Sequence, residues 1–279
     1  MLEVVGEGEP MKAHFRAHLK EYTAFDEDCF ARWADIMQPE TREFLSNNVG
    51  VLFHFSGGES LPFCSAFRIA PNLIATAHHC IPGVQLVFRP LGHPEQEIKV
   101  IKEVKSVVAR GDAAADLDDW AVYQIADTDL PYTWTPDVFA GDILPDNAVY
   151  IFSISEFAYF ITEQGNPDKW RDAMRFSRVN GGKLWPVLDV GASLSKNPEL
   201  VSRCLFDRIP TFAIMSGAAI MAIRRPEGDR PARRLIAGMH LRNGALLSDG
   251  DRSCGTQTGF NVGVRLAPEI LAIATGKAQ

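Results

Sequence analysis

The sequence of 279 residues contains no apolar run long enough to cross a bilayer, and its first residues hold no apolar core of signal-peptide length. It has only five cysteines, an odd number, so at least one of them has no disulfide partner within the chain. Internal repeats and low-complexity segments are also lacking. Together these absences predict a protein that works in the cytoplasm and does not bind a membrane.

Positive charge is scarce as well. The chain has 28 basic and 35 acidic residues, which gives a formal net charge of -7. No basic stripe is available to meet phosphates, so we expect no direct contact with nucleic acid. Cysteines and histidines do not recur at the spacings that hold zinc, and we expect neither a metal nor a cofactor.

The composition is that of a soluble globular protein, with 46% hydrophobic and 23% charged residues. A chain of this length forms either one large all-β domain or two domains of ordinary size.

Residues 1–48 carry a helical pattern, because their apolar residues recur at three- and four-residue spacings. These residues are Phe15, Leu19, Tyr22, Phe25, Phe30, Trp33, Ile36 and Met37. We predict two short helices, the second ending at Pro39. This N-terminal helical extension either packs against the main domain or docks a regulatory protein partner, and packing is the simpler interpretation.

From residue 49 onward, short apolar segments separated by turn residues are typical of strands. They include 50–56, 63–69, 73–77, 84–89, 98–109, 120–125, 148–153, 201–207, 218–224, 234–241 and 259–264. Short strands with regular turns predict a mainly β protein, built as a barrel or a sandwich. We divide them into a first half at 49–140 and a second half at 141–279, which a C-terminal helix at Pro268–Ala274 closes.

Within residues 72–80, an apolar strand runs directly into a turn that carries His78, His79 and Cys80. A rigid strand end is a suitable place to mount a reactive side chain. Histidine can both accept and donate a proton near neutral pH. By itself this turn is compatible with a structural or a catalytic histidine, so the rest of the chain must supply a nucleophile and an acid.

Three fragments resemble motifs of the trypsin-like serine proteases. Thr76-Ala-His-His-Cys80 resembles Thr-Ala-Ala-His-Cys, Asp119-Trp-Ala-Val-Tyr123 resembles Asp-Leu-Ala-Leu-Leu, and Met215-Ser-Gly-Ala218 resembles Asp-Ser-Gly-Gly. The order of His, Asp and Ser is that of the chymotrypsin-like fold. The resemblance extends over residues 49–275 and implies two six-stranded antiparallel β-barrels.

The resemblance implies a catalytic triad of His79, Asp119 and Ser216. In such a triad the histidine takes the proton of the attacking serine, while the aspartate binds the far imidazole nitrogen. His79 is preferred to His78 because it directly precedes the cysteine, as in the family motif.

Asp119 is preferred to Asp116 and Asp118 because it stands immediately before an apolar strand. We expect both neighbours to be exposed to solvent.

The resemblance also implies a disulfide between Cys64 and Cys80, which brackets the catalytic histidine in many members of the family. In a reducing cytoplasm the two would instead remain thiols that pack side by side. The other cysteines, Cys29, Cys204 and Cys254, have no counterpart in the family.

Two further residues match the glutamyl endopeptidases and the viral chymotrypsin-like proteases. Thr211 lies shortly before the nucleophile, and His240 lies in residues 234–244, which resemble the Gly-Ile-His-X-Gly-Gly strand of those families. A hydroxyl and an imidazole suit a carboxylate or a carboxamide. The resemblance therefore implies cleavage after Glu or Gln, and the alternative is that His240 is a core histidine.

The nucleophile loop departs from the family pattern. Backbone amides of Ile214 and Ser216 would form the oxyanion hole, but the family has glycine at the position of Ile214. A β-branched residue resists the positive φ that glycine adopts freely, so we expect the hole to rest in a collapsed form. Met215 replaces the family's aspartate, which argues against activation by trimming of the N-terminus.

Three hypotheses follow from these residues. The chain is a serine endopeptidase that cleaves protein or peptide substrates through an acyl-enzyme, or the same enzyme held inactive until a partner or ligand binds. In the second case residues 1–48 would receive the partner. The third hypothesis is a pseudo-protease that keeps the fold and serves as a protein-binding module.

Overall fold

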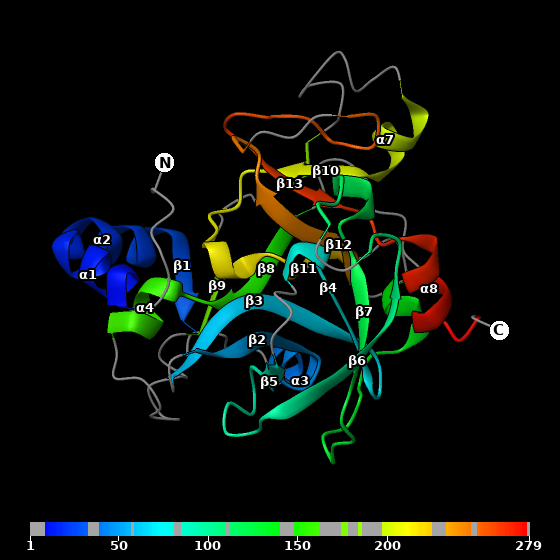
Figure 1. Cartoon of the computed structure of the whole chain (residues 1–279), viewed down its shortest axis with the longest axis horizontal. Helices are drawn as coiled ribbons and strands as arrows, with labels where there is room; N and C mark the ends of the chain where they lie inside the picture. The colour runs from blue at the N-terminus through cyan, green and yellow to red at the C-terminus, as the bar shows by residue number, and fades with distance from the viewer. Residues whose placement is uncertain are drawn as a thin grey trace.

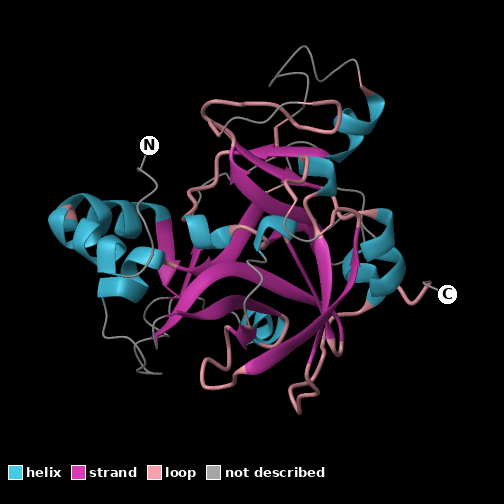
Figure 2. Ribbon diagram, in the orientation of Figure 1, coloured by secondary structure: helices cyan, strands magenta, loops and turns pink. Residues whose placement is uncertain are grey.

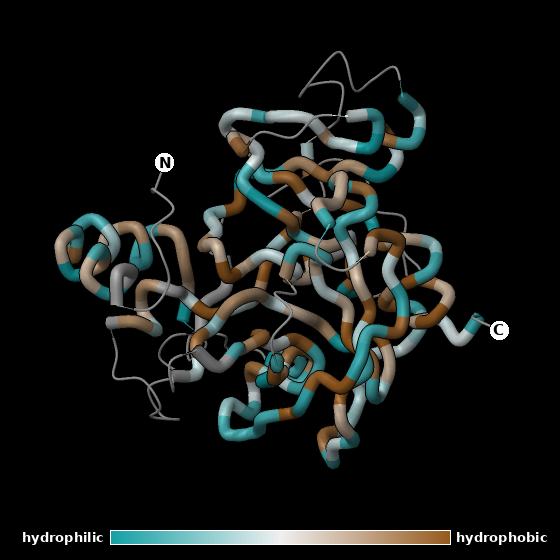
Figure 3. The backbone as a smooth tube through the Cα atoms, viewed as in Figure 1, coloured by the Kyte–Doolittle hydropathy of each residue, from teal (hydrophilic) through white to brown (hydrophobic). Residues whose placement is uncertain are grey.

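The structure, a computed structural model, describes residues 9–32, 39–56, 59–80, 85–109, 112–139, 148–161, 174–177, 184–185, 197–224, 233–246 and 250–277. Strands fill the centre of the molecule, and most of the longer helices lie at its margins (Figure 1 and Figure 2). Hydrophobic segments run along the central strands, and hydrophilic segments are common in the outlying loops (Figure 3). In this described part of the chain, no helix is long and apolar enough to cross a membrane.

Six antiparallel strands close into a barrel in the order β2-β3-β4-β7-β6-β5. They are β2 (Val49–Ser56), β3 (Glu59–Ala70), β4 (Leu73–Thr76), β5 (Leu86–Pro90), β6 (Ile98–Ser106) and β7 (Ala121–Ile125). Closure leaves no unpaired strand edge. Its strands carry fully buried side chains, among them Phe53, Phe67, Phe88 and Ile74.

The second sheet has seven strands in the order β1-β9-β8-β11-β12-β13-β10. They are β1 (Phe30–Arg32), β8 (Val149–Ile154), β9 (Met174–Ser177), β10 (Cys204–Asp207), β11 (Ala219–Arg224), β12 (Arg233–Asn243) and β13 (Asn261–Val264). Within the described residues this sheet is open, so the expectation of a second closed barrel is not met. The division of the chain at residues 48 and 140 stays a prediction.

The N-terminal extension contributes both helices and a strand. Helices α1 (Glu9–Ala17) and α2 (Leu19–Cys29) lie with α4 (Glu156–Ile161) on one side of the molecule (Figure 1). Their contact is aromatic, because the rings of Phe15 and Tyr22 each lie 5.6 Å from that of Phe157. Residues 30–32, expected to be helical, form β1 instead, since their backbone pairs with β9. Residues 33–38 of the expected second helix lie outside the described residues.

Three further helices are α3 (Pro39–Ser46), α7 (Pro198–Arg203) and α8 (Pro268–Ala274). Helix α7 corrects the prediction of a strand at 201–207, of which only residues 204–207 are extended. The cause is local: Asn197 caps the helix by accepting hydrogen bonds from two backbone amides, and Pro198 occupies the first turn.

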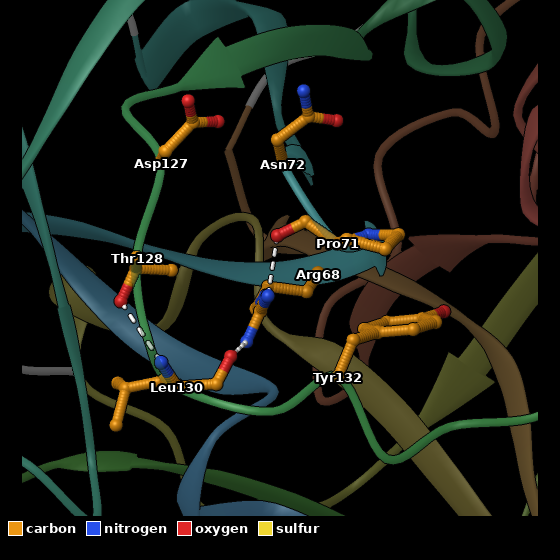
Figure 4. Close-up of a pocket in the computed structure, with 7 residues that line it drawn as sticks. All are labelled: Arg68, Pro71, Asn72, Asp127, Thr128, Leu130 and Tyr132. Atoms are coloured by element: carbon orange, nitrogen blue, oxygen red, sulfur yellow. Dashed lines mark hydrogen bonds between the residues drawn. The ribbon is translucent and has the colours of Figure 1, made fainter.

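The buried guanidinium of Arg68 binds the segment that connects the two sheets. Nη1 of Arg68 donates to the carbonyls of Leu130 (3.1 Å) and Pro131 (3.2 Å), and Nη2 donates to that of Pro71. Arg68 lines a hollow of about 570 Å³ with Asn72 and other residues (Figure 4). Asn72 precedes β4 and His79 follows it, so this hollow lies at the end of β4 away from the histidine turn.

Asp207 organises the chain that leads from β10 toward Thr211. Its Oδ1 accepts hydrogen bonds from the Ile209 amide (2.9 Å) and from the Asn261 side chain (3.0 Å). Its other carboxyl oxygen is buried without a partner among the described residues. Burial outweighs the two hydrogen bonds and raises the pKa of Asp207 to about 6.

The raised pKa of Asp207 predicts how stability depends on pH. The folded protein binds this proton more tightly than the unfolded chain, so the group's contribution is present at low pH and is lost as pH rises through about 6. Asp207→Asn should therefore raise the free energy of unfolding by roughly 1–3 kcal/mol near pH 8 and by little near pH 4. Urea unfolding at both pH values tests this, with the exposed Asp129→Asn as control; an equal gain at both would contradict it.

Candidate active site

His79 and Asp119 come from neighbouring strands of the closed barrel. His79 lies in the 3₁₀ helix η2 (His78–Cys80) after β4, and Asp119 lies between the 3₁₀ helix η3 (Asp116–Asp118) and β7. Strands β4 and β7 are paired through Thr76 and Ala121, which places the two turns side by side.

The Asp119 carboxylate binds His79 at two points. One oxygen lies 2.7 Å from His79 Nδ1, and the other accepts the His79 backbone amide at 2.9 Å. A carboxylate at Nδ1 fixes the proton there and leaves Nε2 as an acceptor. The His79 side chain is 44% exposed, whereas His78 is buried, so only His79 can meet a substrate from solvent.

Ser216 follows the 3₁₀ helix η6 (Ala213–Met215), and its backbone lies next to the histidine turn. Its carbonyl oxygen accepts the Ser65 amide at 2.8 Å and lies 3.7 Å from Cys80 Sγ. Its hydroxyl donates to the Leu241 carbonyl at 2.8 Å. Among the described residues the Ser216 hydroxyl has this partner and no hydrogen bond to His79.

Of the two backbone amides expected to form the oxyanion hole, that of Ser216 is hydrogen-bonded within its own loop. The Ser216 amide donates to the Ala213 carbonyl at 3.1 Å, and the Met215 amide donates to the Phe212 carbonyl at 3.0 Å. The Ala213 carbonyl thus takes the amide that an oxyanion would need. The backbone of η6 is helical, which suits a β-branched residue at Ile214.

A buried pair of serines fixes the far side of this loop. The Ser65 hydroxyl donates to the Ile214 carbonyl at 2.8 Å and lies 2.6 Å from the Ser153 hydroxyl. Since the Ile214 carbonyl is held, the peptide between Ala213 and Ile214 is the unit that would have to turn for the hole to open.

His240 lies on β12 directly beside the nucleophile loop. Its backbone amide donates to Ala218 (2.9 Å), and its carbonyl accepts the Gly217 amide (2.8 Å). The side chain is buried, and Nδ1 has no hydrogen-bond partner among the described residues. Burial, followed by the charges of His79 and Arg242, lowers the pKa of His240 to about 3, so its imidazole is neutral at pH 7. Thr211 is half-buried at the start of the same loop.

Neither protein-family models nor curated protein sequences match the chain. A solved structure of a Glu endopeptidase in complex with MPD is similar, with a TM-score of 0.52 and 15% identity over 90% of this chain and 97% of that one. The fold is that of the chymotrypsin-like serine proteases. A thermostable serine protease from an extremophilic microorganism covers 84% of this chain and 97% of its own at 15% identity, with a TM-score of 0.48.

The structure has two disulfides in this chymotrypsin-like fold. Cys64–Cys80 joins β3 to the histidine turn, and Cys204–Cys254 joins β10 to the loop before β13. The second pair was not predicted from the sequence, because the long separation of the two cysteines gives no local signal. Cys29 is the free cysteine of the described residues. Cys64, His79 and Cys80 lie close enough to suggest a metal site, but both sulfurs are bonded to each other and cannot serve as thiolate ligands.

Asp116 and Asp118 are not the solvent-exposed neighbours that the sequence suggested. The Asp116 side chain is 5% exposed and pairs with Arg242, and the Asp118 side chain is 19% exposed and pairs with Arg252. Burial alone would raise the pKa of Asp116, but the hydrogen bonds and charge of Arg242, with smaller contributions from Cys254 and Ser253, outweigh it and lower the pKa below its ordinary value.

Proposed function

We propose that the chain is a serine endopeptidase held in a latent state. The observation that carries this proposal is the two-point hydrogen bond between Asp119 and His79, in a fold shared with serine proteases. A carboxylate, an imidazole and a hydroxyl gathered in this order are the groups that acyl transfer needs. The substrates are proteins or peptides, and no cofactor takes part.

The mechanism is acyl-enzyme hydrolysis. The Ser216 oxygen attacks the scissile carbonyl while its proton passes to His79 Nε2, and the tetrahedral intermediate forms. His79 then protonates the leaving amine, which releases it and leaves an ester on Ser216. Water attacks the ester while its proton passes to His79, and His79 then returns that proton to the Ser216 oxygen as the bond to the acyl carbon breaks and the acid product departs. Asp119 stabilises the imidazolium in both steps.

Two movements separate the resting state from this mechanism. The Ser216 hydroxyl must leave the Leu241 carbonyl and turn toward His79. The peptide between Ala213 and Ile214 must also turn, so that the amides of Ile214 and Ser216 can stabilise the oxyanion. The second movement carries the larger barrier, because Ile214 would have to adopt a conformation that glycine adopts freely.

The N-terminal extension is well placed to control these movements. The rings of Phe25 and Phe30 lie 5.5 Å and 5.1 Å from that of Phe212. The Phe212 carbonyl accepts the Met215 amide in the closed loop. A protein partner or ligand that binds residues 1–48 and shifts these rings would therefore act on the loop directly. We propose such binding as the event that activates the enzyme.

The competing proposal is a pseudo-protease that binds proteins through the same fold. The closed loop at Ile214 favours it, whereas the hydrogen-bonded His79 and Asp119 favour a catalyst, since a binding module has no need of a fixed tautomer. Reaction of Ser216 with a fluorophosphonate discriminates between the two.

We further propose cleavage after Glu or Gln, with Thr211 and His240 as the recognition residues. The unpartnered Nδ1 of the buried, neutral His240 supports a hydrogen bond to a substrate side chain, because an orphaned polar atom in the interior is costly.

His240→Leu should therefore abolish the preference for Glu or Gln, lowering kcat/KM on such peptides by about 100-fold relative to apolar ones. Thr211→Val should act in the same direction. A peptide library, digested by enzyme in the open-loop background Ile214→Gly, measures the preference, and the buried His54→Leu on β2 is the matched control. Unaltered preference in the His240 variant, or cleavage by the parent after Arg or Phe, would contradict the assignment.

The location in the cytoplasm remains a prediction from the sequence. The two disulfides weigh against a reducing compartment, because structural disulfides are rare in the cytosol of most organisms.

A further inference from the structure

The 3₁₀ helix η3, which delivers Asp119 to His79, is held by the second sheet. Nε and Nη2 of Arg242, on β12, donate to the two carboxylate oxygens of Asp116 at 2.8 Å and 2.7 Å. The Cys254 amide donates to Asp116 at 2.7 Å. Such a two-pronged pair between planar groups fixes orientation as well as distance.

The other residues of η3 are held from the same side. Nε and Nη2 of Arg252 donate to the Asp118 carboxylate at 2.6 Å and 2.8 Å. The Leu117 amide donates to the Arg252 carbonyl at 3.1 Å, and the Leu117 carbonyl accepts Nη2 of Arg203 at 3.1 Å. Every residue of η3 is thus tied to β12, to α7 or to the loop between β12 and β13.

Each partner in this contact adjoins a residue of the proposed active site in the chain. On one side, Asp119 follows η3 directly. On the other side, Arg242 follows Leu241, whose carbonyl accepts the Ser216 hydroxyl. The Cys204–Cys254 disulfide secures the loop that carries Cys254 and Arg252. The distance between the His79–Asp119 pair and Ser216 therefore depends on how η3 sits on β12.

The contact also determines which of the acidic residues at 116–119 can bind His79. Arginines neutralise Asp116 and Asp118, and burial among these donors leaves neither carboxylate free to approach His79. Asp119 is then the one carboxylate of this run whose hydrogen bonds go to the imidazole and backbone of His79.

We propose that Asp116, Asp118, Arg242 and Arg252, here named the clamp, are positioning residues for catalysis. The clamp holds Asp119 and His79 of the barrel in register with Ser216 and Leu241 of the second sheet. It acts through Asp119 and touches no reacting atom. The inference rests on the proposed function, but one of its two readouts needs no activity.

Two variants test the clamp. Asp116→Asn with Arg242→Gln removes both buried charges at once, so no unpaired charge remains in the interior. Arg252→Gln weakens the more exposed pair, and a side chain that is 42% exposed can be changed without unfolding the protein. Glu97→Gln is the control, because it breaks the Arg89–Glu97 pair beside β5, on the side of the barrel opposite β4.

The first readout is the tautomer of His79, taken from ¹⁵N NMR of the imidazole. The parent and Glu97→Gln should carry the proton on Nδ1, and both clamp variants should show a mixture of tautomers. The second readout is kinetic, in the Ile214→Gly background: kcat should fall by about 100-fold in the double variant with KM little changed. Arg242→Lys keeps the charge but cannot make the two parallel hydrogen bonds of arginine, so its kcat should lie between those of the parent and of the double variant.

An unchanged tautomer together with parental kcat in both folded clamp variants would overturn the proposal. If the double variant does not fold, Arg252→Gln alone decides the matter by the same two criteria. If no enzyme hydrolyses peptide yet the tautomer changes in the clamp variants alone, the proposed function fails and the positioning role of the clamp stands.

Discussion

Ile214→Gly should raise peptide hydrolysis by about 100-fold to 1,000-fold, the usual worth of an oxyanion donor. In the resting loop the Ser216 amide donates its hydrogen bond to the Ala213 carbonyl and is not available to an oxyanion. Glycine removes the steric cost of turning the peptide between residues 213 and 214, so the open loop becomes populated. The initial rate on a Glu-containing peptide measures the effect.

Ile214→Ala is the matched control for this prediction. Alanine is not β-branched but still carries a Cβ, so it resists the positive φ and should give a far smaller gain. Ile214 is 1% exposed, and either variant should lose about 3 kcal/mol of stability, so both are assayed well below their unfolding temperatures. Equal gains in the two variants would show that loosening of the loop, and not its backbone conformation, sets the rate.

Asp119→Asn should lower kcat by about 10,000-fold in the Ile214→Gly background. The amide oxygen can still accept the His79 backbone N–H, which turns the amide nitrogen toward Nδ1. An NH₂ group donates, so His79 would have to place its own proton on Nε2, where it cannot take the proton of Ser216. The expected signature is a loss of kcat with a nearly unchanged KM.

The control for this second prediction is Asp112→Asn, an exposed carboxylate of the same connection. It should leave kcat at the parental value. A loss below about tenfold in Asp119→Asn would contradict the assigned role, because catalysis would then not depend on the tautomer of His79.

Local patterns allowed the sequence to predict the strands of the first barrel, and the family resemblance supplied the triad of His79, Asp119 and Ser216, which stays a prediction. Apolar segments at regular spacing marked β2 to β7, and the turn after β4 placed His79 where the structure has it. Ile214 was also informative, since a β-branched residue at a position that needs glycine predicts a loop that prefers another conformation. The closed η6 agrees with that expectation.

The rest depended on contacts between distant segments. Residues 30–32 have a helical pattern, yet they form β1, because an edge of the second sheet offers backbone partners. Cys204 and Cys254 gave no local sign of pairing. Likewise Asp116 was expected to be exposed to solvent, and only the approach of β12 brings Arg242 to it. The helix and strand propensities of single residues and their spacing along the chain carry no information about which distant segments come into contact.

The fold thus carries His79 and Asp119 on the closed barrel and Ser216 in a loop of the second sheet, which in the proposed function are the catalytic pair and the nucleophile. That arrangement makes the resting state easy to control, because a change at η6 or at η3 acts on geometry without removing any catalytic side chain. A latent protease of this kind would be activated by small movements of η6 or η3, because its catalytic side chains are already present.

The most direct test is the rate at which a fluorophosphonate labels Ser216, followed by intact mass and peptide mapping. For a latent protease, Ile214→Gly should be labelled about 100-fold faster than the natural chain, and Ser216→Ala should not be labelled at all. If neither the natural chain nor Ile214→Gly is labelled at Ser216, the chain is not a protease and the binding module is correct.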